Sequence, residues 1–295
     1  MEARDVVVIG AGPSGIAAAI QLRRYRIEPL VLEREEIGGL LPNANLVENY
    51  PGFPEGISGP ALGELFKEQM DRAGAEVRFD NVNRLEHASG RFSIETDGGS
   101  ISSRIAVIAT GTKPREIEGL KVSDDIGDRV FHEVHPLLGV HGKRVAIVGA
   151  GDAAFDYALN MARRNDVVIL NRSDRARCIP VLRERCERAG NISYKDNTAV
   201  EEMGGAGKEV LMKCISGEKR DEISADYVII AVGREPCIGF LGSGLKKDID
   251  GLIDTKALYL VGDVTNGIYR QTAICVGDGV RAAMEIHRSL GQDDS

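Results

Sequence analysis

The hydrophobic residues of this chain fall into short apolar runs that end at glycine, a pattern typical of strands buried in a parallel sheet. The first run, Asp5–Ile9, leads into Gly10 and then into an alanine-rich stretch that predicts a helix as far as about Arg24. A second run, Pro29–Leu32, ends at Glu33. A strand, a glycine turn, a helix and a further strand in this order predict a βαβ unit.

The same pattern returns at Arg144–Arg172. Gly149 lies 139 positions after Gly10, and Arg172 lies 139 positions after Glu33 (149 − 10 and 172 − 33). Equal spacing at both ends indicates an internal repeat, and therefore two copies of the same βαβ unit.

Further elements are predicted by the same kinds of signal. A capped amphipathic helix is expected at Ser58–Gly74, a shorter helix at Val181–Gly190, and a last helix at Gly277–Leu290. Antiparallel strands are expected within Arg91–Val107 and within Glu209–Val228, and a last strand at Ala257–Asp263. Glycine and proline breakers at 111–114 and 233–236 predict two chain crossings that form a two-stranded hinge between domains.

These elements predict an α/β fold with two Rossmann-like dinucleotide-binding domains, each with three layers: helices, a central parallel sheet and a β-meander. The second domain, 113–235, is inserted into the first. The first domain is discontinuous, 1–112 and 236–295, because the last strand is expected to join its sheet.

Composition narrows the function classes. The net charge of −8 argues against a nucleic-acid partner, and no apolar run approaches the roughly 20 residues of a membrane-spanning helix. The cysteines are an odd number without CxxC or metal-ligand spacing, which predicts a reducing, cytoplasmic location and neither a disulfide framework nor a metal site. They are Cys178, Cys186, Cys214, Cys237 and Cys275.

The glycine loops carry the candidate chemistry. In GAGPSG, Gly12 would let a pyrophosphate approach the backbone at a helix N-terminus, and Glu33 can accept hydroxyls of an adenosine ribose. In the repeat, a guanidinium at Arg172 can bind a ribose 2′-phosphate bidentately, with Arg175 and Arg177 close behind. This pattern predicts a second site that accepts NADP; the alternative is a solvated basic loop.

Taken together, VVVIGAGPSG, LEREEIGGLLPNANLVENYPGFP, VAIVGAGDAA, AVGREP and LVGDVTNGIYRQTAICVGDG resemble the low-molecular-weight thioredoxin reductase family of FAD-dependent pyridine-nucleotide oxidoreductases, over nearly the whole chain. The resemblance implies an FAD-binding first domain, a second domain that binds NADPH or NADH, and a homodimer.

The resemblance also implies site residues. Those that would hold FAD are Gly10, Gly12, Gly15, Glu33, Gly38, Gly39, Asn49, Gly262, Asp263, Arg270, Gln271 and Thr272. Those that would hold NAD(P)H are Gly149, Gly151, Asp152, Ala153, Ala154, Arg172, Arg177 and Arg234. Further cofactor-binding candidates are Pro13, Ser14, Arg34, Leu40, Thr110, Gly111 and Gly233. A helix beginning at Gly277 is expected to bring partial positive charge to the flavin.

Departures from the family pattern are equally informative. Family members that reduce disulfides carry a CxxC pair where this chain has HEVH, with His132 and His135 at the cysteine positions. No redox-active disulfide can form there. Leu40 replaces a common glutamine, and Ser173 a commonly basic residue. His132 and His135 are candidate flavin-facing catalytic groups; the alternatives are solvent-facing imidazoles of a connector or, with His141, a metal site.

The predicted function is an FAD-dependent NAD(P)H oxidoreductase in which hydride passes from nicotinamide to flavin N5 and electrons leave the flavin directly. Acceptors in reach of this chemistry are ferredoxin, flavodoxin, a quinone or oxygen. The chain is similar to thioredoxin-reductase-like ferredoxin:NADP reductases, although it lacks their C-terminal extension beyond Gly291. One alternative is a disulfide reductase that uses other cysteines, such as Cys178 with Cys186, or a partner's thiols. The other is a flavin-binding regulatory protein with little turnover.

Overall fold

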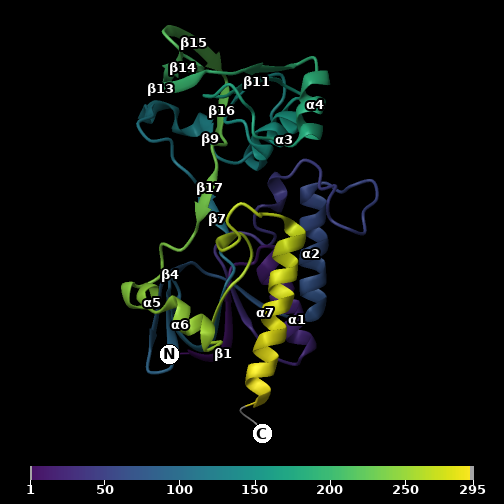
Figure 1. The fold of residues 1–295 in the computed structure, drawn as a ribbon, viewed down its shortest axis with the longest axis vertical. Helices are drawn as coiled ribbons and strands as arrows, with labels where there is room; N and C mark the ends of the chain where they lie inside the picture. The colour runs from purple at the N-terminus through teal and green to yellow at the C-terminus, as the bar shows by residue number, and fades with distance from the viewer. Residues whose placement is uncertain (1, 293–295) are drawn as a thin grey trace. The chain divides into compact units, whose positions relative to one another are not determined.

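The chain forms two units, each built on a sheet whose central strands are parallel, in a computed structural model that describes residues 2–292 (Figure 1). Unit 1 takes the chain up to Pro42, then Glu48–Lys113, and the chain from Glu235 onward. Unit 2 takes Pro114–Arg234 together with Asn43–Val47. The second domain predicted from the sequence, 113–235, does not include the short segment Asn43–Val47. Residues 1 and 293–295 of the predicted first domain lie outside the described residues.

Unit 1 contains a seven-stranded sheet in the order β3-β2-β1-β6-β5-β4, with β18 also paired to β6. The central strand β1 lies parallel to both neighbours, so its apolar half is buried on both faces. The long strand β6 is parallel to β1 and β18 but antiparallel to β5. The last strand therefore joins the first sheet, as predicted. The strands are β1 Glu2–Ile9, β2 Leu30–Glu33, β3 Glu76–Phe79, β4 Val82–Ala88, β5 Arg91–Thr96, β6 Gly99–Ile108 and β18 Leu258–Leu260.

Three long helices of unit 1 lie side by side: α1 (Pro13–Arg24), α2 (Gly59–Ala73) and α7 (Thr272–Gln292) (Figure 1). α2 has the predicted caps, with the Ser58 side chain accepting from a backbone N–H and Gly74 in the left-handed conformation. Two short helices, α5 (Ser243–Lys247) and α6 (Ile249–Asp254), and the 3₁₀ turns η1 (Leu41–Asn43) and η4 (Gly262–Val264) complete the unit.

The predicted start of the last helix at Gly277 is wrong by more than a turn. The helix begins at Thr272, and its first backbone bond runs from the Cys275 N–H to the Gln271 carbonyl. The glycine that matters for packing is Gly279, where a Cβ would lie 2.1 Å from the Ser14 carbonyl oxygen. Glycine therefore lets α7, about two turns after its start, contact the backbone at the start of α1.

Unit 2 is built on a parallel five-stranded sheet in the order β12-β11-β10-β16-β9. Its strands alternate between two cores. Val145 and Ile147 of β10 face α3 and α4, whereas Ala146 and Val148 face the second sheet. The strands are β9 Val130–Phe131, β10 Arg144–Val148, β11 Asp166–Leu170, β12 Ile192–Lys195 and β16 Tyr227–Ile230.

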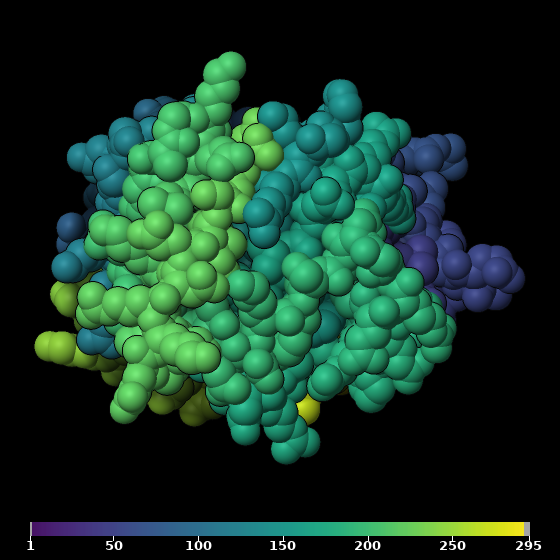
Figure 2. Space-filling view, turned by 90° about the horizontal axis from the view of Figure 1, so that it is seen from above, coloured from purple at the N-terminus to yellow at the C-terminus, as the bar shows by residue number. Residues whose placement is uncertain are grey.

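The second sheet of unit 2 has the order β15-β14-β13-β8, in which the three longer strands form an antiparallel meander. Helices α3 (Asp152–Met161) and α4 (Pro180–Arg188) cover the other face of the parallel sheet. The meander strands and α4 both contribute to the outer surface of this unit, in green and teal respectively (Figure 2). The predicted order of helices, parallel sheet and meander is confirmed. The remaining elements are β8 Lys121–Val122, β13 Ala199–Ala206, β14 Glu209–Ser216, β15 Lys219–Ala225, η2 Asp124–Arg129 and η3 His135–Leu137.

The two chain crossings pair as a two-stranded sheet, β7 (Thr112–Pro114) with β17 (Arg234–Pro236). Backbone bonds flank the pair, from the Arg115 N–H to the Gly233 carbonyl and from the Cys237 N–H to the Gly111 carbonyl. The predicted pairing is confirmed, and its action as a hinge stays a prediction.

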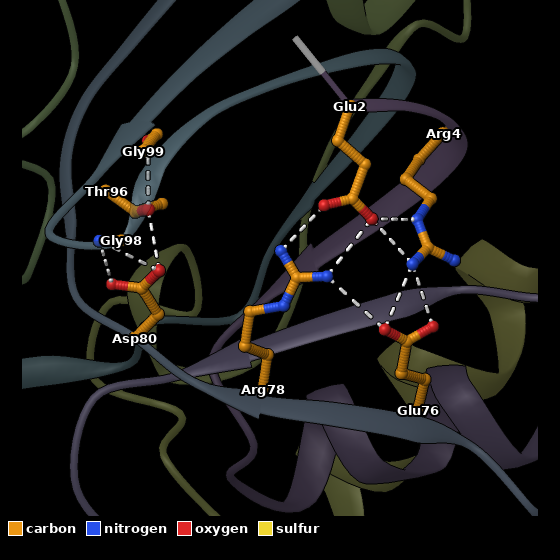
Figure 3. Close-up of polar contacts among 8 residues, drawn as sticks. All are labelled: Glu2, Arg4, Glu76, Arg78, Asp80, Thr96, Gly98 and Gly99. Carbon is orange, nitrogen blue, oxygen red and sulfur yellow. Dashed lines mark hydrogen bonds and ion pairs between the residues drawn. The ribbon is translucent and has the colours of Figure 1, made fainter.

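An ionic network joins β1 to β3, which are not neighbours in the sheet (Figure 3). The Glu2 carboxylate accepts from Arg4 and Arg78, each at 2.8 Å, and Glu76 accepts from Arg4 at 3.0 Å. These two guanidinium groups lower the pKa of Glu2 to about 2. Beside the network, Asp80 accepts from the Thr96 hydroxyl at 2.6 Å and from the Gly98 N–H, which holds the turn between β5 and β6.

Candidate functional site

In unit 1, the predicted glycine loop lies at the carboxyl end of β1, between β2 and β6. Gly10 has φ +105°, and a Cβ there would lie 2.5 Å from the Ala109 carbonyl oxygen. At Gly15 a Cβ would lie 1.9 Å from the Gly10 carbonyl oxygen. The Cβ direction of Gly12 is open, with only the Gly39 Cα within 4 Å, at 3.9 Å. The loop therefore fits a phosphate that approaches the backbone at the N-terminus of α1.

Glu33, at the end of β2, faces this loop. Its carboxylate accepts from the Ala11 N–H at 2.7 Å and the Glu35 N–H at 3.0 Å. A carboxylate has about four acceptor positions, so two remain for ligand hydroxyls. Gly38 joins the same loop by donating its N–H to the Ala11 carbonyl at 2.8 Å.

The third part of this edge follows β18. Asp263 lies in η4, and its Oδ1 accepts from the Cys275 thiol at 3.1 Å. Burial, and then the negative charge of Asp263, raise the pKa of Cys275. The Ser14 hydroxyl donates to the Val261 carbonyl at 3.3 Å, and Asp278 of α7 accepts from the Gly262 N–H. The carboxyl ends of β1, β2 and β18 therefore lie at the same end of the sheet, and α1 and α7 lie beside them.

Other predicted cofactor residues of unit 1 are held by local contacts. Asn49 donates to the Gln271 side chain at 2.8 Å, and the Thr110 hydroxyl donates to the Cys237 carbonyl at 2.8 Å. Arg34 pairs with the neighbouring Glu35. The remaining members are Pro13 at the start of α1, the exposed Leu40, Gly111 with φ +60°, the half-buried Arg270, and Thr272 at the start of α7.

In unit 2, the second loop repeats the first glycine and changes the third. Gly149 has φ +131°, and a Cβ there would lie 2.2 Å from the Ala231 carbonyl oxygen. A Cβ on Gly151 would meet nothing within 4 Å. The third position is Ala154, which is fully buried in the helix-side core. Unit 2 therefore has alanine at the position of Gly15 in unit 1, while the middle glycine stays open to a ligand.

The basic loop after β11 carries Arg172, Arg175 and Arg177, all exposed. Within residues 2–292, no ion pair or side-chain hydrogen bond engages their guanidinium groups. Residues 173–178 line an open depression of about 520 Å³. The loop backbone is tied down by two bonds, from the Arg177 N–H to the Ala150 carbonyl and from the Ile179 N–H to the Asp152 carboxylate, each 2.8 Å. Exposed guanidinium groups on a fixed backbone suit an anionic ligand.

The HEVH segment directly follows β9 in unit 2. His132 is half-buried, and its Nδ1 is buried without a hydrogen-bond partner among the described residues. His135 is exposed at the start of η3, and its N–H donates to the Asn43 side chain at 2.9 Å. Within residues 2–292, no group of three or more His, Cys, Asp or Glu residues is arranged to hold a metal ion. A flavin-facing role for the two histidines stays a prediction.

Glu133, between the histidines, makes the strongest contacts of the segment. Its Oε1 accepts from Arg234 of β17, and its Oε2 accepts from the Tyr157 hydroxyl of α3 at 2.8 Å. Burial, and then the Glu133 charge, raise the pKa of Tyr157. Neither Glu133 nor Tyr157 was singled out on the sequence. The sequence pattern predicts no strand before Glu133, and its position two residues after β9 becomes visible only in the structure.

The segment Asn43–Val47 is fixed to α3. Asp156 accepts from the Asn45 N–H at 2.7 Å, and Arg163 donates to the Asn45 side chain at 2.7 Å. Burial raises the pKa of Asp156 to about 6, although the Asn45 N–H and Arg163 act in the opposite direction.

All five cysteines are free thiols. Cys186, Cys214 and Cys275 are buried, and burial raises the pKa of Cys186 to about 12 and of Cys214 to about 11. Burial also raises the pKa of Cys178. Since the thiolate is the nucleophile in disulfide exchange, these four side chains are poorly suited to it.

The whole chain is similar to known proteins. A family model described as pyridine nucleotide-disulphide oxidoreductase matches residues 4–279. The thioredoxin reductase of Pneumocystis carinii is 30% identical over 317 aligned residues, which cover 98% of this chain and 96% of that protein. The thioredoxin reductase of Borreliella burgdorferi is 30% identical over 302 residues, covering 97% and 92%. Among solved structures, Lactococcus lactis thioredoxin reductase matches with a TM-score of 0.87 at 27% identity, covering 98% of this chain and 99% of the other.

Proposed function

Because the chain belongs to the pyridine nucleotide-disulphide oxidoreductase family, we propose that it passes electrons from NADPH through FAD directly to an external acceptor, without an internal redox disulfide. The chain is an FAD-dependent oxidoreductase similar to thioredoxin reductase, and FAD and NADPH are the cofactors of this family. When bound, the nicotinamide supplies the hydride and the flavin accepts it.

Unit 1 is the proposed FAD-binding domain. The open backbone at Gly12 and the N-terminus of α1 would receive the pyrophosphate, and Glu33 would accept the adenosine ribose hydroxyls. Asp263 would accept a ribityl hydroxyl, with its carboxylate oriented by the Cys275 thiol. The N-terminus of α7 would bring partial positive charge to the isoalloxazine ring, which favours its reduced, anionic form.

Unit 2 is the proposed NADPH-binding domain. The open backbone at Gly151 and the N-terminus of α3 would receive the pyrophosphate. Arg172 and Arg177 would bind the 2′-phosphate, since their exposed guanidinium groups have no competing carboxylate within the described chain.

The observation that carries direct transfer to an acceptor is the HEVH segment. Residues His132–His135 contain no cysteine, and Glu133 fixes the segment to α3 and β17. Burial raises the pKa values of Cys186, Cys214 and Cys275, which makes these thiols poor relays of electrons. The proposed acceptors are a small redox protein such as ferredoxin or flavodoxin, or a quinone, and the protein is expected to act as a homodimer.

The test is a variant in which all five cysteines are replaced, by alanine or serine, and the FAD is retained. We expect NADPH to bleach its flavin in anaerobic stopped-flow experiments, and to reduce a one-electron dye at a rate within about twofold of the unmodified protein. Reduction of an aromatic disulfide is expected to be negligible in both proteins. Dye reduction that disappears with the cysteines would refute direct transfer.

A second candidate is disulfide reduction with a thioredoxin-like partner, which the names of the relatives favour. It requires the partner to bring both reacting sulfurs to the flavin, since this chain lacks the cysteine pair. NADPH-dependent reduction of thioredoxin by the cysteine-free variant would support it over ferredoxin-type acceptors.

A further inference from the structure

The parallel sheet of unit 2 arranges its chemical groups in a defined order along its carboxyl edge. Arg172 follows β11, the glycine loop follows β10, Arg234 follows β16, and Glu133 follows β9. The strand order β11-β10-β16-β9 therefore puts the basic loop on one side of the glycine loop and Glu133 with Arg234 on the other. A dinucleotide whose pyrophosphate lies at the glycine loop and whose 2′-phosphate lies at Arg172 would extend its other half toward Arg234.

Glu133 is the point at which three separate elements meet. Its two carboxylate oxygens are each engaged, one by Arg234 and the other by the Tyr157 hydroxyl. The side chains of Glu133 and Arg234 are only 23% and 21% exposed, so water screens the pair weakly. Tyr157 is buried on α3, the helix that begins at the glycine loop, and it holds the carboxylate from the opposite side.

We propose that Glu133 is a positioning residue for Arg234, and that it aligns this guanidinium for the nicotinamide half of NADPH. The proposal rests on the assignment of unit 2 as the NADPH domain. The role of the HEVH segment is then that of its glutamate. Glu133 lies at the carboxyl end of β9 and orients the Arg234 guanidinium, which would bind the cofactor. Tyr157 acts through Glu133, by fixing the carboxylate that fixes Arg234.

The test separates the two halves of the ligand. NADP⁺ spans the whole edge and does not reduce the flavin, whereas adenosine 2′,5′-bisphosphate reaches the basic loop and, with its 5′-phosphate, the glycine loop, but not Arg234. We expect Glu133→Gln in the FAD-loaded protein to weaken NADP⁺ binding about tenfold by calorimetry, because an ion pair is replaced by a weaker hydrogen bond from the guanidinium to a neutral amide. Binding of adenosine 2′,5′-bisphosphate is expected to change less than twofold.

Three further variants make the result specific. Tyr157→Phe removes a single hydroxyl and is expected to weaken NADP⁺ binding two- to fourfold with no effect on the bisphosphate; it also serves if Glu133→Gln fails to fold. The matched control is Glu235→Gln, which removes the neighbouring and more exposed ion pair with Lys113 and should leave both affinities unchanged. Glu133→Asp keeps the charge and should recover part of the loss.

The outcomes are distinct. Equal weakening of both ligands by Glu133→Gln would mean a general structural role and would overturn the proposal, as would unchanged binding of both. If the unmodified protein binds neither ligand, the assignment of unit 2 fails and this inference fails with it. Weakened NADP⁺ with intact bisphosphate binding supports both.

Discussion

The carboxyl group of Asp156 should make the stability of unit 2 fall as the pH rises toward neutrality. Burial raises its pKa from 3.8 to about 6, so the folded state keeps a proton that the unfolded chain releases between these values. The unfolded state binds fewer protons in this window, and stability therefore decreases as the pH rises through it. A shift of about two units corresponds to about 3 kcal/mol at most.

The perturbation is Asp156→Asn, which removes the titration and keeps one oxygen to accept the Asn45 N–H. The loss of charge weakens that bond by about 1 kcal/mol, which leaves a net gain of about 1 to 2 kcal/mol at pH 7.5. At pH 4.5 most of the gain should be absent, because the carboxyl is then protonated in the folded protein. Arg163 and Arg185 also face the carboxyl and remain in the variant.

The assay is hydrogen exchange of the amides in 43–47 and in α3, which reports local opening in a protein whose two units need not unfold together. The quantity of interest is the difference between variant and parent at pH 4.5, 6 and 7.5. Asp128→Asn is the control, since its side chain is 80% exposed. A difference for Asp156→Asn that is flat over this range would refute the reasoning.

Two other outcomes are expected. Arg172→Ala should weaken NADPH binding by about 1.5 to 3 kcal/mol, the range of a hydrogen bond to a charged group, and leave NADH binding nearly unchanged; equal effects on both, measured by flavin-bleaching titration beside the control Lys208→Ala, would contradict the 2′-phosphate assignment. Glu2→Gln should lower the thermal midpoint above pH 4.5 and lose its effect as the pH falls toward 2, because the lowered pKa of Glu2 means that its ion pairs disappear over this range. A pH-independent difference between Glu2→Gln and the parent in scanning calorimetry would argue against that role.

The features that the sequence predicted well are those fixed by neighbouring residues. The helix after Gly10 and the cap at Ser58 depend on local backbone geometry, and both are confirmed. The elements that were missed depend on distant partners. β3 has only four residues, two of them polar, and becomes a strand because it pairs with β2. The start of α7 was drawn at Gly277 because glycine reads as a boundary, although here it lies inside the helix.

The candidate site divides in the same way. The glycine loops could be recognised because strand, turn and helix are contiguous. The sequence does not indicate the role of Glu133, because its partner Arg234 lies 101 positions away. Asn45 and Asp156 are 111 positions apart in the sequence, and their contact makes the segment Asn43–Val47 part of unit 2. Neither composition nor periodicity indicates this contact.

The two loops also show which glycines serve the fold and which serve a ligand. At Gly10 and Gly149 a Cβ would collide with a carbonyl oxygen of the neighbouring strand, so the protein itself requires glycine. At Gly12 and Gly151 the backbone is extended with negative φ, and a Cβ would meet at most one atom, at 3.9 Å. Nothing in the described chain explains glycine at these two positions. A ligand that approaches the backbone would explain both, because each lies between a parallel strand and the N-terminus of a helix, which is where a dinucleotide site receives its pyrophosphate.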